Sequence, residues 1–163
     1  MIRHLSIRFA KKDDCNFVTH AVKQLIQMGE NLEELPEVEN MDKCFEELIS
    51  DPKHSAIFVA EDGGKKLGAA IVTFQNALHF GGKYAYLQEL VIDPAARGLG
   101  VGSKMLKKIE QHAKENGMIA LDLTQPPPTS QGDAERSKFY QKNGYEMGGV
   151  SRAKVFKKWF HGK

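Results

Sequence analysis

The sequence predicts a mixed α/β domain with a mostly antiparallel sheet, a central parallel β-α-β unit and helices on both faces. Three observations favour this fold class. Apolar, β-branched runs alternate along the chain with amphipathic stretches of helical period. The runs 56–61 and 67–75 are separated by Asp62-Gly63-Gly64, which is typical of a hairpin. A single helical stretch separates the runs 83–92 and 118–124, so these two strands should be parallel in a right-handed crossover.

The N-terminal third predicts one strand and two helices. Residues 5–9 alternate apolar and polar side chains like a short strand, and Asp13 is expected to cap the helix that follows. The apolar residues of that helix fall on one face: Cys15, Val18, Val22, Leu25 and Ile26. Residues 30–39 form a connecting loop before a second helix, which is expected to end at Asp51-Pro52. The apolar face of the second helix consists of Met41, Cys44, Phe45, Leu48 and Ile49.

The C-terminal half predicts two more helices and three more strands. The first helix begins after a glycine-rich turn and should stop at Asn116-Gly117. Its apolar face consists of Val101, Met105, Leu106, Ile109 and Ala113. A stiff loop with three prolines, 125–132, follows the parallel strand. Asp133 is expected to cap a short helix that ends at Asn143-Gly144, and residues 145–147 and 153–156 are expected to be closing strands.

Length and composition limit the class of protein. A chain of 163 residues with 41% hydrophobic content can bury one sizeable core, so a single domain over residues 1–163 is expected. The net charge of +2 does not favour a nucleic-acid partner. Cys15 and Cys44 belong to separate amphipathic segments and read as reduced thiols. Neither a signal sequence nor a long apolar span is evident, so the expected protein is cytoplasmic with no membrane partner.

The run from Leu90 to Ser103 carries most of the functional information. An apolar strand stops at Pro94, passes through three alternating glycines and leads directly into an amphipathic helix. This joint presents main-chain N–H groups at the positive end of a helix dipole, with no side chains in the way. It therefore suits an anionic phosphate or pyrophosphate.

Two common phosphate-binding motifs fit this turn poorly. A P-loop needs lysine directly after its last glycine, but here Ser103 precedes Lys104. The dinucleotide fingerprint wants its third glycine one residue after Gly102 and an acidic residue about 20 residues further on, a distance near which Asp122 falls. However, that fold places its glycines after the first strand, whereas four strands and two helices precede them here.

A third interpretation rests on two motifs. Arg97-x-x-Gly100-x-Gly102 resembles the Q/R-x-x-G-x-G/A acyl-CoA motif of the GCN5-related N-acetyltransferases, the GNAT superfamily. The segment from Phe139 to Tyr145, FYQKNGY, looks like the F-Y-x-x-x-G-F/Y segment of the same superfamily. The expected order of elements also resembles that of a single GNAT domain over nearly the whole chain.

The resemblance implies acetyl-CoA as the acyl donor and no metal. The main-chain N–H groups and the Arg97 guanidinium would hold the pyrophosphate, and the pantetheine arm would pair with the strand edge like an extra strand. The implied cofactor residues are Leu90, Val91, Ile92, Arg97, Gly98, Leu99, Gly100, Val101, Gly102 and Ser103.

The resemblance also assigns roles in acetyl transfer. Tyr140 matches the tyrosine near the sulfur and would donate a proton to the thiolate. If its strand is regular, Glu89 lies on the same side as Leu87 and Val91, where desolvation would raise its pKa and suit it to act as the general base. Gln88, where many relatives carry glutamate, cannot take a proton, so a structural or substrate-binding role for Glu89 stays open. A bulge in this strand would also exchange its two faces. The oxyanion donor would be the N–H of Leu90 or Val91.

The acceptor is suggested by charge alone. The loop between the first two helices holds five glutamates, and Glu33 and Glu34 are the candidates for substrate binding. They favour a cationic small molecule, such as a polyamine or a lysine-like amine, or a basic peptide. A solvated acidic loop that serves solubility is the alternative.

The C-terminal segment mixes basic and aromatic residues: Arg152, Lys154, Phe156, Lys157, Lys158, Trp159, Phe160 and Lys163. A closing strand with a basic outer face accounts for it more simply than a nucleic-acid-binding segment. Two other functions stay open, an acyl-CoA-binding regulator without turnover and a nucleic-acid-binding module. A homodimer is compatible with the sequence.

Overall fold

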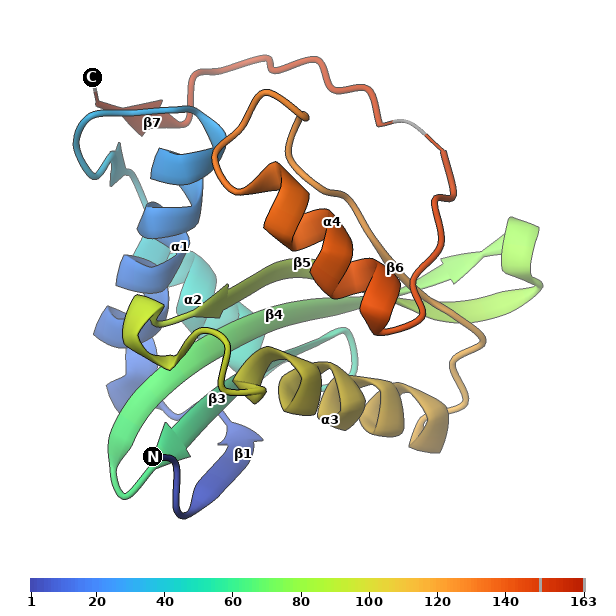
Figure 1. Cartoon of the computed structure of the whole chain (residues 1–163). Coiled ribbons are helices and arrows are strands. Elements are labelled where there is room, and N and C mark those ends of the chain that lie inside the picture. Colours follow the sequence, from blue (N-terminus) through green and yellow to red (C-terminus); the bar gives the residue numbers. More distant parts are fainter. Residues whose placement is uncertain (150, 163) are drawn as a thin grey trace. The chain divides into compact units, whose positions relative to one another are not determined.

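The computed structural model describes residues 1–149 and 151–162 (Figure 1). Its contacts divide the chain into two compact units, residues 1–22 with 40–123, and residues 23–39 with 124–163. The first unit holds a five-stranded sheet in the order β1-β3-β4-β5-β6. The strands are β1 (Leu5–Phe9), β3 (Ser55–Asp62), β4 (Lys65–Ala77), β5 (Gly82–Ile92) and β6 (Leu121–Leu123).

All pairs in this sheet are antiparallel except β5 and β6, which are parallel. The connection between β5 and β6 is α3 (Val101–Glu115), which confirms the predicted β-α-β unit. Main-chain N–H groups of Gly117 and Met118 donate to carbonyls of Lys114 and Ala113, so the helix stops at Asn116-Gly117 as predicted.

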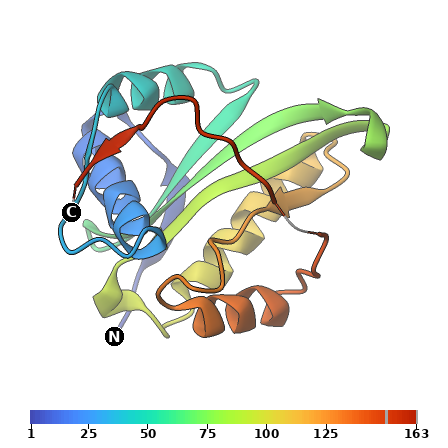
Figure 2. The same cartoon turned by 90° about the horizontal axis from the view of Figure 1, so that it is seen from above.

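Helices cover both faces of the sheet in the first unit (Figure 2). One face packs against α2 (Met41–Ser50) and the first half of α1 (Cys15–Gly29), with Val18 and Phe45 meeting Ile57 and Ile71. The other face packs against α3. There the His112 ring contacts the rings of three phenylalanines, Phe9, Phe58 and Phe74, at centroid distances of 5.4, 5.7 and 5.6 Å.

Close packing of α3 on the sheet requires glycine at position 68. A Cβ there would lie 2.7 Å from the Val91 carbonyl oxygen and 3.3 Å from the Met105 sulfur. We expect Gly68→Ala to lower the free energy of unfolding by about 1–3 kcal/mol, because neither the strand nor the helix can move away freely. Urea denaturation measures this, and Gly29→Ala is the control, since its nearest contact would be an ordinary 3.9 Å. Equal stability of both variants would contradict the expectation.

The start of α1 differs from the prediction. A short 3-10 helix, η1 (Lys12–Asp14), precedes α1, and Asp13 is exposed and caps nothing. The neighbouring Asp14 is buried and accepts the Lys11 N–H at 2.7 Å. It also contacts the side chains of Arg8 and Lys66 at 2.8 and 2.7 Å, and Arg8 reaches on to Glu61 at 2.9 Å. The sequence shows two adjacent aspartates but not which of them turns inward.

The second unit contains the end of α1, a short strand pair and a helix. The strands are β2 (Glu37–Val38) and β7 (Phe160–His161), which pair antiparallel, and the helix is α4 (Asp133–Lys142). The cap of α4 is Gly132, not Asp133, which instead lies in the first turn 4.0 Å from Arg136. The predicted closing strands are wrong, because residues 145–147 and 153–156 form no strand; Phe156 is 92% exposed. Lys163 lies outside the described residues.

Candidate active site

The fifth strand contains an irregularity at its centre. Leu87 pairs with Val72 and Glu89 pairs with Ile71, which leaves Gln88 as an extra residue, a β-bulge. Opposite residues of an antiparallel pair share a face, so Leu87 lies on the α3 face while Glu89 lies with Ile71 on the other face. The expectation that Glu89 shares a side with both Leu87 and Val91 is therefore wrong for Leu87 and correct for Val91. The bulge moves Glu89 to the side of α1 and α2.

The Glu89 side chain lies on the face of the sheet that carries the apolar core cluster. Its own strand places Val91 beside it, and Ile71 of the core lies opposite. Loss of solvent disfavours the charged form and raises the pKa of Glu89 to about 7. A carboxylate with such a pKa accepts a proton at neutral pH far better than an ordinary exposed glutamate does.

The strand edge next to Glu89 is open beyond the bulge. The parallel ladder between β5 and β6 joins Ala85–Leu87 to Leu121–Leu123, and among the described residues it goes no further. The N–H of Asp93 donates to the Leu67 carbonyl on β4 at 2.8 Å. Because hydrogen bonding alternates along an antiparallel ladder, Val91 also directs its main-chain groups to β4, whereas Leu90 and Ile92 direct theirs to the open edge.

The glycine turn follows directly. The Asp93 side chain accepts a hydrogen bond from the N–H of Ala95 at 2.8 Å and so caps the N-terminus of the short 3-10 helix η3 (Pro94–Ala96). Gly98 and Gly100 have φ values of +75° and +80°, a left-handed conformation that favours glycine. α3 then begins at Val101 with Gly100 as its cap, without a capping side chain and without an acidic residue in its first turn. The first N–H groups of α3 are therefore left for a ligand.

Arg97 joins the turn to the open strand edge. Its side chain is exposed, and its Nε donates to the Ile92 carbonyl at 3.2 Å. This bond restrains the guanidinium group of Arg97 through its Nε atom. The chain thus places the carboxyl group of Glu89, the open edge at Leu90 and Ile92, and the glycine turn within fifteen consecutive residues of one unit.

Tyr140 lies in α4 of the second unit. The helix ends through two main-chain bonds, from the N–H of Gly144 to the Gln141 carbonyl and from the N–H of Tyr145 to the Tyr140 carbonyl, both 3.0 Å. The left-handed Gly144, with φ of +87°, allows this turn. It brings the ring of Tyr145 against that of Tyr140, with centroids 5.8 Å apart. The FYQKNGY segment thus fixes the Tyr140 side chain from two sides, since Phe139 contacts it at 5.1 Å.

The acidic loop of the second unit is only partly available to a substrate. Glu37 pairs with Lys23 at 3.2 Å, and Glu39 lies 3.5 Å from Lys157. Glu33 and Glu34, the predicted substrate-binding residues, are exposed, as is Glu30. Three carboxylates of the loop are thus exposed and outside these ion pairs, while Glu37 and Glu39 are exposed but each lies near a lysine.

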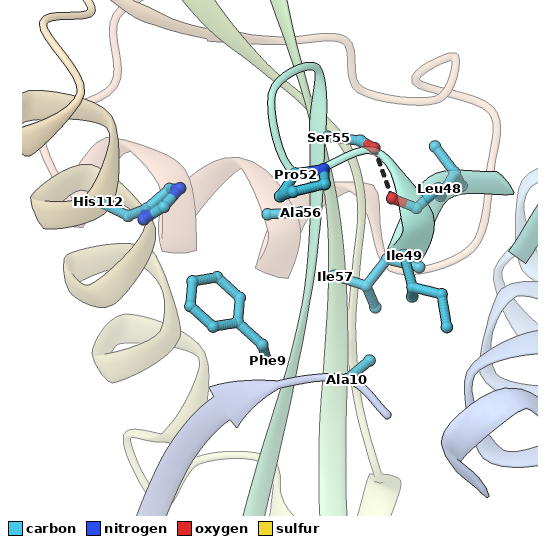
Figure 3. A pocket seen from close by; sticks show the side chains of 9 residues that line it. All are labelled: Phe9, Ala10, Leu48, Ile49, Pro52, Ser55, Ala56, Ile57 and His112. Carbon is cyan, nitrogen blue, oxygen red and sulfur yellow. Dashed lines mark hydrogen bonds between the residues drawn. The ribbon is translucent and has the colours of Figure 1, made fainter. Parts of the chain in front are cut away.

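One pocket of the first unit lies away from all of these residues (Figure 3). Phe9 and His112 line one side, and apolar residues from the end of α2 and from β3 line the other. It lies at the β1 edge of the sheet, and its lining includes none of the predicted site residues.

Neither a metal site nor a membrane-spanning helix is found among residues 1–149 and 151–162. No group of three or more His, Cys, Asp or Glu side chains there is arranged to hold a metal ion. No helix in these ranges is both long enough and apolar enough to cross a bilayer.

A bulge that exchanges the faces of this strand was one of the alternatives left open by the sequence, and the structure locates it at Gln88. Gln88 is exposed and donates to the Thr73 hydroxyl at 3.5 Å. The apolar pattern of residues 84–92 gives no warning of the extra residue, because Leu87, Glu89 and Val91 alternate as in a regular strand. Only the pairing with β4 reveals it.

The sequence and the fold match known acetyltransferases. The family model for the acetyltransferase (GNAT) domain matches residues 53–147. A rice protein (Oryza sativa subsp. japonica) described as "Probable glucosamine 6-phosphate N-acetyltransferase 2" is 30% identical over 118 residues, which cover 69% of this chain and 67% of that one.

Solved structures share the fold. A transcriptional regulator from Bacillus halodurans C-125 superposes with a TM-score of 0.78 at 25% identity, covering 94% of this chain and all of that one. Glucosamine-6-phosphate N-acetyltransferase from Arabidopsis thaliana superposes with a TM-score of 0.69 at 24% identity, covering 95% and 100% of the two chains.

The chain belongs to the GNAT acetyltransferase family. It is accordingly an acetyl-CoA-dependent N-acetyltransferase, and the predicted family, fold class and enzyme class are confirmed.

Proposed function

We propose that the protein transfers the acetyl group of acetyl-CoA to the primary amine of a small molecule by direct attack in a ternary complex. The observation that carries this proposal is the position and burial of the Glu89 carboxyl group. The β-bulge turns this carboxyl group beside an open strand edge, and burial brings its pKa to about 7.

The cofactor is proposed to bind along β5 and the glycine turn. The pyrophosphate accepts hydrogen bonds from main-chain N–H groups between Arg97 and Ser103, together with the Arg97 guanidinium. The pantetheine amides pair with the open edge of β5. The alternation of the ladder assigns this pairing to Leu90 and Ile92, because Val91 directs its main-chain groups to β4 and its side chain is buried.

The chemistry divides among three groups. The acceptor loses its ammonium proton to water and reacts as the neutral amine. Glu89, directly or through water, takes one proton from the nitrogen as that nitrogen attacks the thioester carbon. The N–H of Leu90, which faces the open edge, stabilises the tetrahedral oxyanion. The C–S bond then breaks, and the Tyr140 hydroxyl gives its proton to the departing thiolate.

Replacing Tyr140 by phenylalanine tests the proposed acid. The ring contacts with Phe139 and Tyr145 should survive, so the fold and the acetyl-CoA affinity should be nearly unchanged. We expect kcat to fall by a factor on the order of 10 to 1,000, since proton donation to the thiolate is lost. Steady-state kinetics with a parallel measurement of the acetyl-CoA dissociation constant checks this. An unchanged kcat would remove Tyr140 from the mechanism.

The rice relative acts, by its description, on an amino sugar, which supports a small-molecule acceptor. The exposed Glu30, Glu33 and Glu34 favour a second class, a polyamine or a basic peptide. In this second case Glu33 and Glu34 bind the cationic part of the acceptor.

A panel of acceptors tests the proposal. CoA release is followed with glucosamine, glucosamine 6-phosphate, an aminoglycoside, spermidine and a lysine-rich peptide. We expect turnover with a small-molecule amine. Tight acetyl-CoA binding without CoA release from any amine would overturn the proposal and indicate an acyl-CoA-binding regulator; steeply salt-dependent binding of RNA or DNA would indicate a nucleic-acid-binding module.

A further inference from the structure

The face of the sheet that carries Glu89 changes character beyond Ile71. On the α1 and α2 side, the apolar core cluster includes Ile57, Val59, Ala69 and Ile71. The next positions on this face carry uncharged hydroxyl and amide side chains. This polar row consists of Thr73, Gln75, Tyr84 and Gln88, and Tyr86 lies opposite Thr73 on the same face.

Strand register places the polar row on the face of Glu89. Thr73 and Gln75 follow Ile71 at intervals of two residues on β4, and Ile71 lies opposite Glu89. Tyr84 lies opposite Gln75. Gln88, the bulge residue, reaches Thr73 and so belongs to the same face. All these residues are in the first unit.

Hydrogen bonds connect the polar row into one chain. Tyr84 donates its hydroxyl proton to Gln75 Oε1 at 3.0 Å, and Gln75 Nε2 donates to Thr73 Oγ1 at 3.4 Å. Gln88 Nε2 donates to the same oxygen at 3.5 Å. The Thr73 oxygen thus uses both its lone pairs as acceptor, and its own proton remains to be donated. Within the ranges that the structure describes, no acceptor for that proton is present.

The chemistry of the polar row identifies its ligand. A phosphate is held best by Arg or Lys and a cationic amine by carboxylates, whereas this row presents only neutral donors and acceptors. Sugar-like hydroxyl groups both donate and accept, so they match it. We propose that the polar row binds hydroxyl groups of the acceptor and selects a hydroxylated amine, with Thr73 donating to one of them. This inference rests on the proposed function, since it places the acceptor next to Glu89.

Two ring amines test the proposal. Glucosamine carries hydroxyl groups and cyclohexylamine carries none, and each variant is compared with the wild-type protein on each amine separately, which cancels the difference in amine basicity. We expect Thr73→Val and Gln75→Leu to lower kcat/KM for glucosamine by about 10- to 100-fold and to leave kcat/KM for cyclohexylamine within about 2-fold, because a site built to bind hydroxyl groups loses most with the substrate that carries them.

Asn76→Leu is the matched control. Asn76 follows Gln75 on β4 and is exposed. It pairs with Lys83 and lies on the other face of the sheet, away from the polar row. It should leave both amines unaffected, and thermal melts verify that the variants fold. Equal losses on both amines, no loss on either, or turnover of cyclohexylamine without turnover of glucosamine would overturn the inference and leave the acetyltransferase proposal intact. No CoA release by the wild-type protein from any amine of the larger panel would overturn both.

Discussion

Replacing Glu89 by glutamine is expected to lower kcat by a factor on the order of 10² to 10⁴, the usual range for loss of a general base. Glutamine keeps the shape of the side chain and its place opposite Ile71, so the fold should persist. It cannot accept a proton from the amine. Steady-state kinetics with a saturating small-molecule amine measures the effect, and Glu47→Gln, an exposed glutamate of α2, is the control.

The pH dependence separates a base from a merely structural glutamate. Below pH 7 the Glu89 carboxyl is protonated and cannot act, so kcat/KM for the wild-type protein should rise through a pKa of about 7. For Glu89→Gln this rise of kcat/KM with pH should be absent. A second readout is stability. The folded pKa of Glu89 lies above its unfolded value, so burying its charge costs stability as the pH rises from about 4.3 through 7. Glu89→Gln should therefore gain stability relative to the wild type at pH 8 compared with pH 4. A Glu89→Gln variant with full kcat and the same rise of kcat/KM through pH 7 would contradict the role of Glu89 as general base.

Replacing Asp14 by alanine is expected to lower the free energy of unfolding by about 2–4 kcal/mol at pH 7. The side chain is only 2% exposed and pairs with Arg8 and Lys66 at 2.8 and 2.7 Å. Its removal leaves two half-buried cations with less compensation, although Arg8 keeps Glu61 at 2.9 Å. Urea denaturation measures the loss, and Asp13→Ala is the matched control because that neighbour is exposed.

At acidic pH the difference in free energy of unfolding between the wild type and Asp14→Ala should become smaller. Hydrogen bonds from Arg8 and from the Lys11 N–H outweigh the effect of burial and hold the pKa of Asp14 well below its usual range. The stability that this carboxylate contributes is therefore fully present above about pH 4 and is lost as the pH falls towards the folded pKa. A difference that stays constant down to pH 2, or an equal effect of Asp13→Ala, would show that the ion pairs do not stabilise the fold.

Sequence patterns predicted the elements that depend on local periodicity. The Asp62-Gly63-Gly64 hairpin, the crossover helix after Gly102 and the stop at Asn116-Gly117 follow from turn chemistry and apolar spacing, and each is present. The family resemblance rested on Arg97, Gly100, Gly102 and the segment around Tyr140, and it is confirmed.

Features that depend on distant partners could not be located from the sequence, even where, as for a bulge near Glu89, they were considered. The bulge at Gln88 arises from pairing with β4, and it decides which face Glu89 occupies. The choice of Asp14 over Asp13 depends on Arg8 and Lys66, which are brought to it by the sheet. The closing strands predicted at 145–147 and 153–156 are absent, because a strand depends on packing against neighbours more than on an intrinsic preference of the backbone.

Calorimetric titration with CoA, acetyl-CoA and pantetheine tests the central claim, that main-chain N–H groups of the turn between β5 and α3 hold the cofactor diphosphate. We expect one site for CoA and acetyl-CoA, with pantetheine, which lacks the diphosphate, at least about 10-fold weaker because the charge-assisted hydrogen bonds are lost. Pantetheine binding as tightly as CoA, or uptake of a nicotinamide dinucleotide or nucleoside triphosphate in place of CoA, would contradict the account.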